Sequence, residues 1–206
     1  AGVRTAALIT NMDSPLGSAV GNSLEVIESV EILKGKTSGD LWTVCRELSC
    51  RMLMLAGIGD KDECGRLVDE AVESGEALKR FEMMVKLQGG DVSYIEDTSK
   101  FRKASFSREV YAPADGYITH MDSEKIGLTA VLLGAGREKK EDNINHAAGI
   151  MIAAKAGDFV KRGELLATLF ADNKSRLDGA ESRYLSAVSI GDKKPAEQPM
   201  ILDYID

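Results

Sequence analysis

The chain has 206 residues, 44% hydrophobic and 29% charged, a composition typical of a folded globular protein that excludes disorder throughout. A formal net charge of −7 excludes the basic surface that nucleic acids and anionic membranes attract, and it is typical of a cytoplasmic protein. No apolar run reaches membrane length, and the first residues, AGVRTAALIT, lack a signal-peptide pattern. Because the sequence enters an apolar run almost at once and has no initiator Met, we expect it to be part of a longer chain.

The three cysteines are odd in number and show no C-x-x-C spacing, so the sequence predicts neither a disulfide framework nor a zinc site. Cys45 and Cys64 lie in apolar helical stripes, which indicates buried, reduced thiols.

Residues 5–10 (TAALIT) form a short apolar run that predicts a buried parallel strand. A helix is expected from about Asn22 to Lys34, because apolar residues recur there every three or four positions and Gly35 follows. Three more helices should follow. Asp40 is expected to cap the first of these three, and Asp60 the next one. Their apolar stripes predict faces packed into a core, at Leu41, Val44, Cys45, Leu48, Met52 and Leu55, at Leu67, Val68, Ala71 and Val72, and at Leu78, Phe81, Met84 and Val85.

Short strands separated by turns replace the helices after about residue 105, which predicts a domain boundary there. Strands are expected at 109–112, 117–121, 150–153, 165–170 and 200–205, with helices at 126–133 and 177–190. We expect Phe159, Val160, Leu165 and Leu169 to share a core with Ile118 and Ile150. The fold class is therefore α/β, with a first part at 1–105 and an α+β domain at 106–206.

The stretch NMDSPLGSAVGNSLEVIES (11–29) places a turn of small residues directly before a helix. Such a turn exposes backbone carbonyls on one side and helix N–H groups on the other, which suits an ion or a phosphate. A plain strand-to-helix connection explains the same residues. Glu25 and Glu28 follow on the helix and could serve acid or base chemistry, although solvated helix glutamates are the ordinary case.

The stretch GAGREKKEDN (134–143) combines glycines with three basic residues, yet it lacks the spacing of a P-loop. A mobile charged surface loop is one interpretation, and a lid that closes over a negatively charged ligand is the other. His120 and His146 are the only histidines, and they are too far apart in sequence for a local metal motif. Both are interpreted as surface or satisfied side chains.

Two segments, ADGYI (114–118) and GDFVKRGELLATL (157–169), resemble the repeated hairpins of biotinyl- and lipoyl-carrier domains, which form a small barrel-sandwich. A carrier presents a lysine in an M-K-M or D-K-A turn between the two halves. The corresponding stretch here, NHAAGIMIAAKAGD, has no such turn, so the hairpins are expected without the carrier chemistry.

Taken together with GVRTAALITNMDSPLGSAVGNSLEV, VESGEALKRFEMMVKLQGGD and LGAGREKKED, these segments resemble the C-terminal half of the thymidine and pyrimidine-nucleoside phosphorylase family. The likeness runs in order over essentially the whole chain. It implies that residues 1–105 are the C-terminal part of a large α/β domain, followed by the family's C-terminal domain with barrel-sandwich-like hairpins. It also implies a homodimeric pentosyltransferase that uses inorganic phosphate to cleave pyrimidine nucleosides into free base and ribose or deoxyribose 1-phosphate.

The resemblance further implies a potassium ion, held by the backbone carbonyls of Leu16 and Ala19 and by the carboxylate of Glu28. Oxygen ligands suit a hard cation. No organic cofactor is implied. Glu28 lies nine residues beyond Ala19, about 13 Å along a straight helix, so the turn must fold back toward the carboxylate.

The family's K-H-S-T-G-G type phosphate motif and its base-binding Arg, Ser and Lys have no counterpart in these 206 residues. No catalytic residue is therefore assigned, and the chain alone is expected to be inactive, because the reaction needs an oriented phosphate and donors to the departing base. The alternative is a non-catalytic barrel-sandwich binding or carrier-like module.

Overall fold

The computed structural model describes residues 2–137 and 139–205 as a mixed α/β protein. Contacts divide the chain into two compact units, each assembled from separate segments. The first comprises Ala1–Asn11, Ser29–Thr98 and Gln198–Asp206, and the second comprises Met12–Glu28 and Ser99–Glu197. Residues 12–28 group with the second unit and residues 198–206 with the first, so the contact units do not correspond to one cut in the sequence. The domain division at residue 105 therefore stays a prediction.

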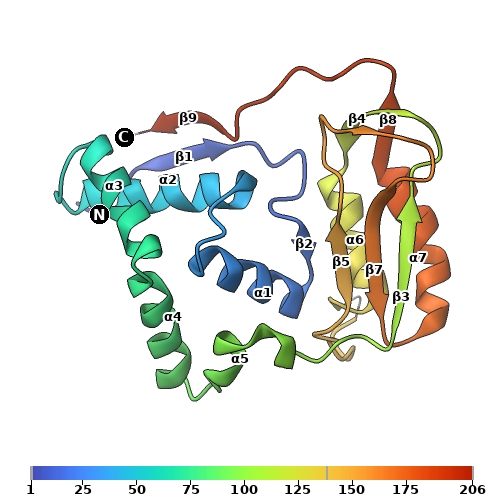
Figure 1. Cartoon of the computed structure of the whole chain (residues 1–206), viewed down its shortest axis with the longest axis horizontal. Helices are drawn as coiled ribbons and strands as arrows, with labels where there is room; N and C mark the ends of the chain where they lie inside the picture. The colour runs from blue at the N-terminus through green and yellow to red at the C-terminus, as the bar shows by residue number, and fades with distance from the viewer. Residues whose placement is uncertain (1, 138, 206) are drawn as a thin grey trace. The chain divides into compact units, whose positions relative to one another are not determined.

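The first unit contains a two-stranded antiparallel sheet of β1 (Ala7–Thr10) and β9 (Ile201–Ile205). Its helices are the end of α1 (Asn22–Leu33), α2 (Gly39–Leu55), α3 (Lys61–Glu73), α4 (Glu76–Leu87) and α5 (Ser93–Glu96), as Figure 1 shows. The prediction of a buried parallel strand at 5–10 was wrong, because β1 pairs antiparallel with the C-terminal strand and no residue of it is buried.

Local signals set the helix boundaries. Asp60 caps α3 as predicted, and its side chain accepts the N–H of Glu63 at 2.9 Å. The predicted cap at Asp40 was wrong by two positions, because α2 begins at Gly39 with Ser38 as its N-cap. Asp40 lies inside the first turn, where its carboxylate accepts the N–H of Leu41.

The buried face of α2 differs from the predicted stripe. Val44, Glu47 and Cys50 are buried, and α3 packs on α2. Leu48 and Met52 are 45% and 70% exposed. A helix with apolar residues on more than one side has several possible inward faces, and its neighbours decide which one is buried. The stripe of α4 likewise has no buried residue.

The three cysteines differ in their burial, and only part of the prediction for them holds. Cys64 is buried as predicted, whereas Cys45 is exposed, so that prediction was wrong. Cys50 is fully buried, and its thiol donates to the carbonyl of Lys61 at 3.4 Å. Burial and the nearby Glu47 raise the pKa of the Cys50 thiol, so it stays protonated.

In the described ranges, the second unit contains two antiparallel sheets, two complete α-helices and the first residues of α1. One sheet has the order β2-β5-β7-β3 and the other the order β6-β4-β8. Their strands are β2 (Ala19–Val20), β3 (Phe106–Tyr111), β4 (Gly116–Met121), β5 (Gly149–Ile152), β6 (Phe159–Val160), β7 (Leu165–Ala171) and β8 (Val188–Gly191). The helices are α6 (Ser123–Leu133), capped by Asp122, and α7 (Lys174–Ala187). The predicted helix at 177–190 ends at Ala187, where β8 begins.

The core of the second unit confirms most of the predicted residues. Val160, Leu169, Ile118 and Ile150 are each at most 1% exposed. Phe159 was predicted wrongly: it is 51% exposed and lies edge-on against Tyr117, with the ring centroids 5.1 Å apart. Leu165 is only half-buried, and the neighbouring Leu166 is buried in its place, because β3 and β7 shift register where Tyr111 pairs with Leu165.

Within the described ranges, no helix combines the length and the apolar character that crossing a membrane requires.

Candidate functional site

The turn that precedes α1 lies in the second unit, together with the first residues of that helix. As predicted, α1 begins at Asn22. Glu25 stabilises this start, because its Oε1 accepts the N–H of Gly21 at 2.8 Å and so pairs a backbone donor just before the helix. The Asn22 side chain donates to the carbonyl of Ala135, and Ser23 N–H donates to the carbonyl of His146. Both contacts fix the helix start against the 134–146 loop.

Glu28 reaches back to the turn, as the predicted site requires. Its Oε1 accepts the N–H of Ser18 at 2.7 Å, and its Oε2 accepts the N–H of Ala19 at 3.2 Å. Gly17 makes this approach possible, since it has a φ of 72° and a Cβ there would lie 2.4 Å from Oε2 of Glu28. The carboxylate therefore lies directly against the turn backbone, despite its nine-residue separation from Ala19 in sequence.

Strand β5 holds the other side of the same turn. Ile152 N–H donates to the carbonyl of Ser18 at 2.8 Å, and Ala19 pairs with Met151 across the sheet. Ala19 is 3% exposed, and its N–H faces Glu28. Leu16 is half-buried, immediately before Gly17. The structure thus brings two predicted residues, Ala19 and Glu28, into contact and places the third one residue before the glycine that Glu28 touches.

Sequence reasoning missed Lys155, which also contacts this turn. Its Nζ donates to the carbonyl of Gly17 at 2.6 Å in a partly buried position, although the two residues are 138 apart in sequence. The turn therefore lies between a carboxylate on α1 and an ammonium group just after β5. The signal that could have drawn attention to Lys155 is a lone basic residue in the otherwise small and apolar stretch AAKAG.

The other sequence candidates do not assemble into a site. His120 and His146 are both exposed, as predicted. Among the described residues, no three His, Cys, Asp or Glu side chains gather as a metal site. In the 134–143 loop, Glu138 lies outside the described residues, and Lys139 and Asp142 form a local turn, with Lys139 N–H donating to Asp142 at 2.9 Å. A lid function for this loop stays a prediction.

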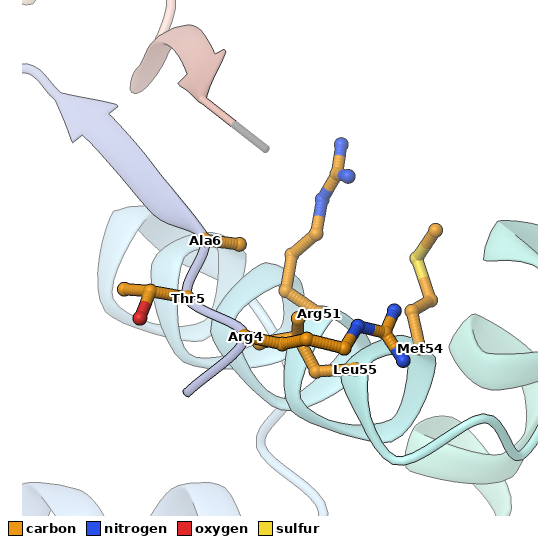
Figure 2. Close-up of a pocket in the computed structure, with 6 residues that line it drawn as sticks. All are labelled: Arg4, Thr5, Ala6, Arg51, Met54 and Leu55. Atoms are coloured by element: carbon orange, nitrogen blue, oxygen red, sulfur yellow. The ribbon is translucent and has the colours of Figure 1, made fainter. Parts of the chain in front are cut away.

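The first unit has a cavity of ≈ 410 Å³ between α2 and the segment before β1. Figure 2 shows that the guanidinium groups of Arg4 and Arg51, which both line it, point in different directions. Arg51 stacks on the ring of Tyr204 at 4.1 Å and pairs with Glu47 at 3.5 Å. Because Arg51 is engaged in these contacts, we interpret it as a structural group that holds β9 rather than as part of a site.

Comparisons with known proteins agree with the sequence resemblance. Residues 117–191 match the family described as the pyrimidine nucleoside phosphorylase C-terminal domain. The pyrimidine-nucleoside phosphorylase of Bacillus subtilis (strain 168) is 41% identical over 175 residues, which are 84% of this chain and 40% of that protein. That of Geobacillus stearothermophilus is 35% identical over 202 residues, 98% of this chain and 46% of that protein.

This chain spans less than half the length of these relatives. The matched region runs over both contact units and includes nearly every residue in the Geobacillus comparison. The chain therefore belongs to the pyrimidine-nucleoside phosphorylase family and corresponds to its C-terminal half.

Proposed function

We propose that this chain is the C-terminal portion of a pyrimidine-nucleoside phosphorylase, a pentosyltransferase that carries out reversible phosphorolysis. The whole protein would convert a pyrimidine nucleoside and inorganic phosphate into the free base and ribose or deoxyribose 1-phosphate. Two relatives with that name, matched over 84% and 98% of this chain, support the proposal. The main structural support is that Glu28 lies against the Leu16–Ala19 turn, with its Oε1 2.7 Å from the backbone N of Ser18.

The turn is proposed to supply part of a potassium site in the whole protein. Carbonyl oxygens of Leu16 and Ala19 and the carboxylate of Glu28 form a hard oxygen donor set, which suits a cation of this kind. The contact of Glu28 with the turn supports this assignment, because it brings a negatively charged carboxylate within hydrogen-bond distance of the backbone of Ser18 and Ala19. When bound, the ion would supply fixed positive charge close to the phosphate substrate.

Lys155 is proposed to stabilise the same turn by holding the carbonyl of Gly17. Hydrogen bonds from Lys155 and to Glu28 would keep the turn in one conformation, so that its carbonyls need little rearrangement when a cation binds. The first 105 residues are proposed to belong to the large α/β domain. The antiparallel sheets of the second unit are proposed to be the barrel-sandwich of the C-terminal domain.

A cytoplasmic homodimer without an organic cofactor is the proposed state of the whole protein. The 206-residue chain alone is proposed to be inactive, since no K-H-S-T-G-G type stretch occurs in its sequence. An enzyme that holds neither phosphate nor base in attack geometry loses both orientation and charge stabilisation.

The test measures release of free base from thymidine and from uridine with phosphate, over a range of potassium concentrations. The isolated chain should show no turnover, and the whole protein should be active. In the whole protein, Glu28→Gln should raise the potassium concentration needed for half-maximal activity, while Glu31→Gln on the same helix should not. Turnover by the isolated chain would refute its proposed inactivity, and an unchanged potassium response in Glu28→Gln would refute the potassium site.

A further inference from the structure

A second cavity, of ≈ 480 Å³, lies in the second unit between the end of α6, the segment 143–146 and the start of α7. Two arginines, Arg102 and Arg176, line it together with His146 and, among the described residues, a single carboxylate, that of Asp172. None of these residues belongs to the candidate site formed by Glu28 and the Leu16–Ala19 turn. The volume of the cavity lies within the range of sites that hold small organic ligands.

Asp172 is saturated by donors from the protein. Its Oδ1 accepts the N–H of Ser105 at 2.8 Å and the Ser105 hydroxyl at 3.0 Å. Its Oδ2 accepts from the side-chain amide of Asn145 at 2.9 Å and from the guanidinium of Arg102. The carboxylate is therefore committed to holding Arg102 and the 143–146 segment in place, and it neutralises only one of the two arginines.

Arg176 and His146 remain available to a ligand. Arg176 Nη1 donates to the carbonyl of Leu132 at 3.3 Å, and in the described parts of the chain no carboxylate pairs with its guanidinium. The backbone carbonyl of His146 is used by Ser23, whereas its ring has no partner among the described residues. Arg176 and His146 both line the cavity, and a guanidinium and an imidazole are donors that suit a phosphate group.

We propose that this cavity binds a small phosphate monoester, with Arg176 and His146 as the donors to its phosphate oxygens. Among the described lining residues, the formal charges of Arg102, Arg176 and Asp172 sum to a net positive charge, which attracts an anion. The half-buried side chain of Ile144 also lines it and provides an apolar surface for the organic part of the ligand. This inference does not depend on the phosphorylase activity of the whole protein.

Titration of the ¹⁵N-labelled 206-residue chain tests the proposal, with ribose 5-phosphate, inorganic phosphate and ribose as probes. Ribose 5-phosphate should give saturable shifts at the amides of Gly134, Asn145 and Asn173, with half-saturation at or below about 1 mM. Tighter binding of ribose 5-phosphate than of phosphate supports the monoester, and equal binding assigns the site to free phosphate instead. Shifts of equal size with ribose, or no saturation at about 10 mM, would refute an anion site.

Two matched variants separate a specific contact from general charge. Arg176→Gln should weaken ribose 5-phosphate binding about tenfold or more, the typical loss for a hydrogen bond between charged groups. Arg183→Gln removes the same charge from an exposed position further along α7 and should leave binding unchanged. His146→Gln should weaken binding several-fold. Equal losses in Arg176→Gln and Arg183→Gln would show that only net charge matters, and that result would refute the proposed site.

Discussion

The carboxylate of Glu28 accepts the backbone N–H of Ser18 at 2.7 Å, which closes a ten-residue loop between the turn and the second turn of α1. A second hydrogen bond joins the same carboxylate to Ala19. Both contacts are part-buried, so without Glu28 these two backbone N–H groups would lose a charged acceptor. The side chain therefore has a structural role in the chain alone, before any cation is considered.

Glu28→Ala should lower the free energy of unfolding of the second unit by about 1 to 3 kcal/mol, because it removes two charge-assisted hydrogen bonds. Urea unfolding followed by circular dichroism measures the loss. Glu31→Ala, on the same helix, removes a carboxylate whose ion pair is with Lys36, a side chain 72% exposed, and should cost less than about 1 kcal/mol. Equal costs for the two variants would contradict the structural role of Glu28.

Features that depend on a few neighbouring residues were predictable from the sequence. The start of α1 at Asn22 and the cap at Asp60 follow from local patterns of polar and apolar residues, and the structure confirms both. The contact between Glu28 and the turn required more. The resemblance placed the residues in one site, but only the positive φ of Gly17 explains how the backbone folds back to meet the carboxylate.

Features that depend on distant segments were not predictable. Periodicity identifies apolar faces, but it does not say which of them meets a neighbour, so Met52 was expected inside and is 70% exposed. Lys155 reaches Gly17 across 138 residues, and no local pattern reports that contact. In the same way, β1 pairs antiparallel with β9, the last strand described, and the pattern of residues 5–10 alone does not identify that partner.

Leu166→Ala should destabilise the second unit by about 2 to 5 kcal/mol, because Leu166 is 1% exposed in the core and its loss leaves a cavity. Leu165→Ala, one residue earlier in β7, should cost clearly less, since that side chain is only half-buried. The comparison of these two variants tests whether Leu166 is the core residue of β7, where the sequence had predicted Leu165. Urea unfolding of both variants measures the two free energies. A larger loss in the free energy of unfolding for Leu165→Ala would mean that Leu165, and not Leu166, points into the core.

Gly149→Ala should destabilise the second unit by about 3 kcal/mol or more, because a Cβ at this position would lie 2.4 Å from the carbonyl oxygen of Val20. The approach brings β5 against β2 and so positions the turn at Ala19. Gly157→Ala is a matched control, as it also has a positive φ but no atom within 4 Å of the added Cβ. It should cost about 1 to 2 kcal/mol from backbone conformation alone. Unfolding midpoints that are the same for both variants would argue against close packing at Gly149.

The acid sensitivity of the second unit should depend on Asp172. The guanidinium of Arg102 and the N–H of Ser105 hold the pKa of this carboxyl well below its usual range. As the pH falls below the usual carboxyl range, the unfolded chain takes up a proton at Asp172 while the folded chain does not. The contribution of Asp172 to the free energy of unfolding is thus complete above the unfolded pKa and is lost as the pH falls toward the lowered folded pKa.

Asp172→Asn should therefore flatten the decline in thermal stability between about pH 5 and about pH 3, although it lowers stability at neutral pH by weakening the contacts to Arg102 and Ser105. Melting temperatures measured at closely spaced pH values test this. Asp178→Asn is the control, because Asp178 also pairs with an arginine, Arg108, but its side chain is 72% exposed. Its melting curve should follow the wild-type pH dependence, since exposed ion pairs contribute little to stability. If Asp172→Asn keeps the wild-type slope over this range, the donors around Asp172 do not set the acid response, and another carboxylate must.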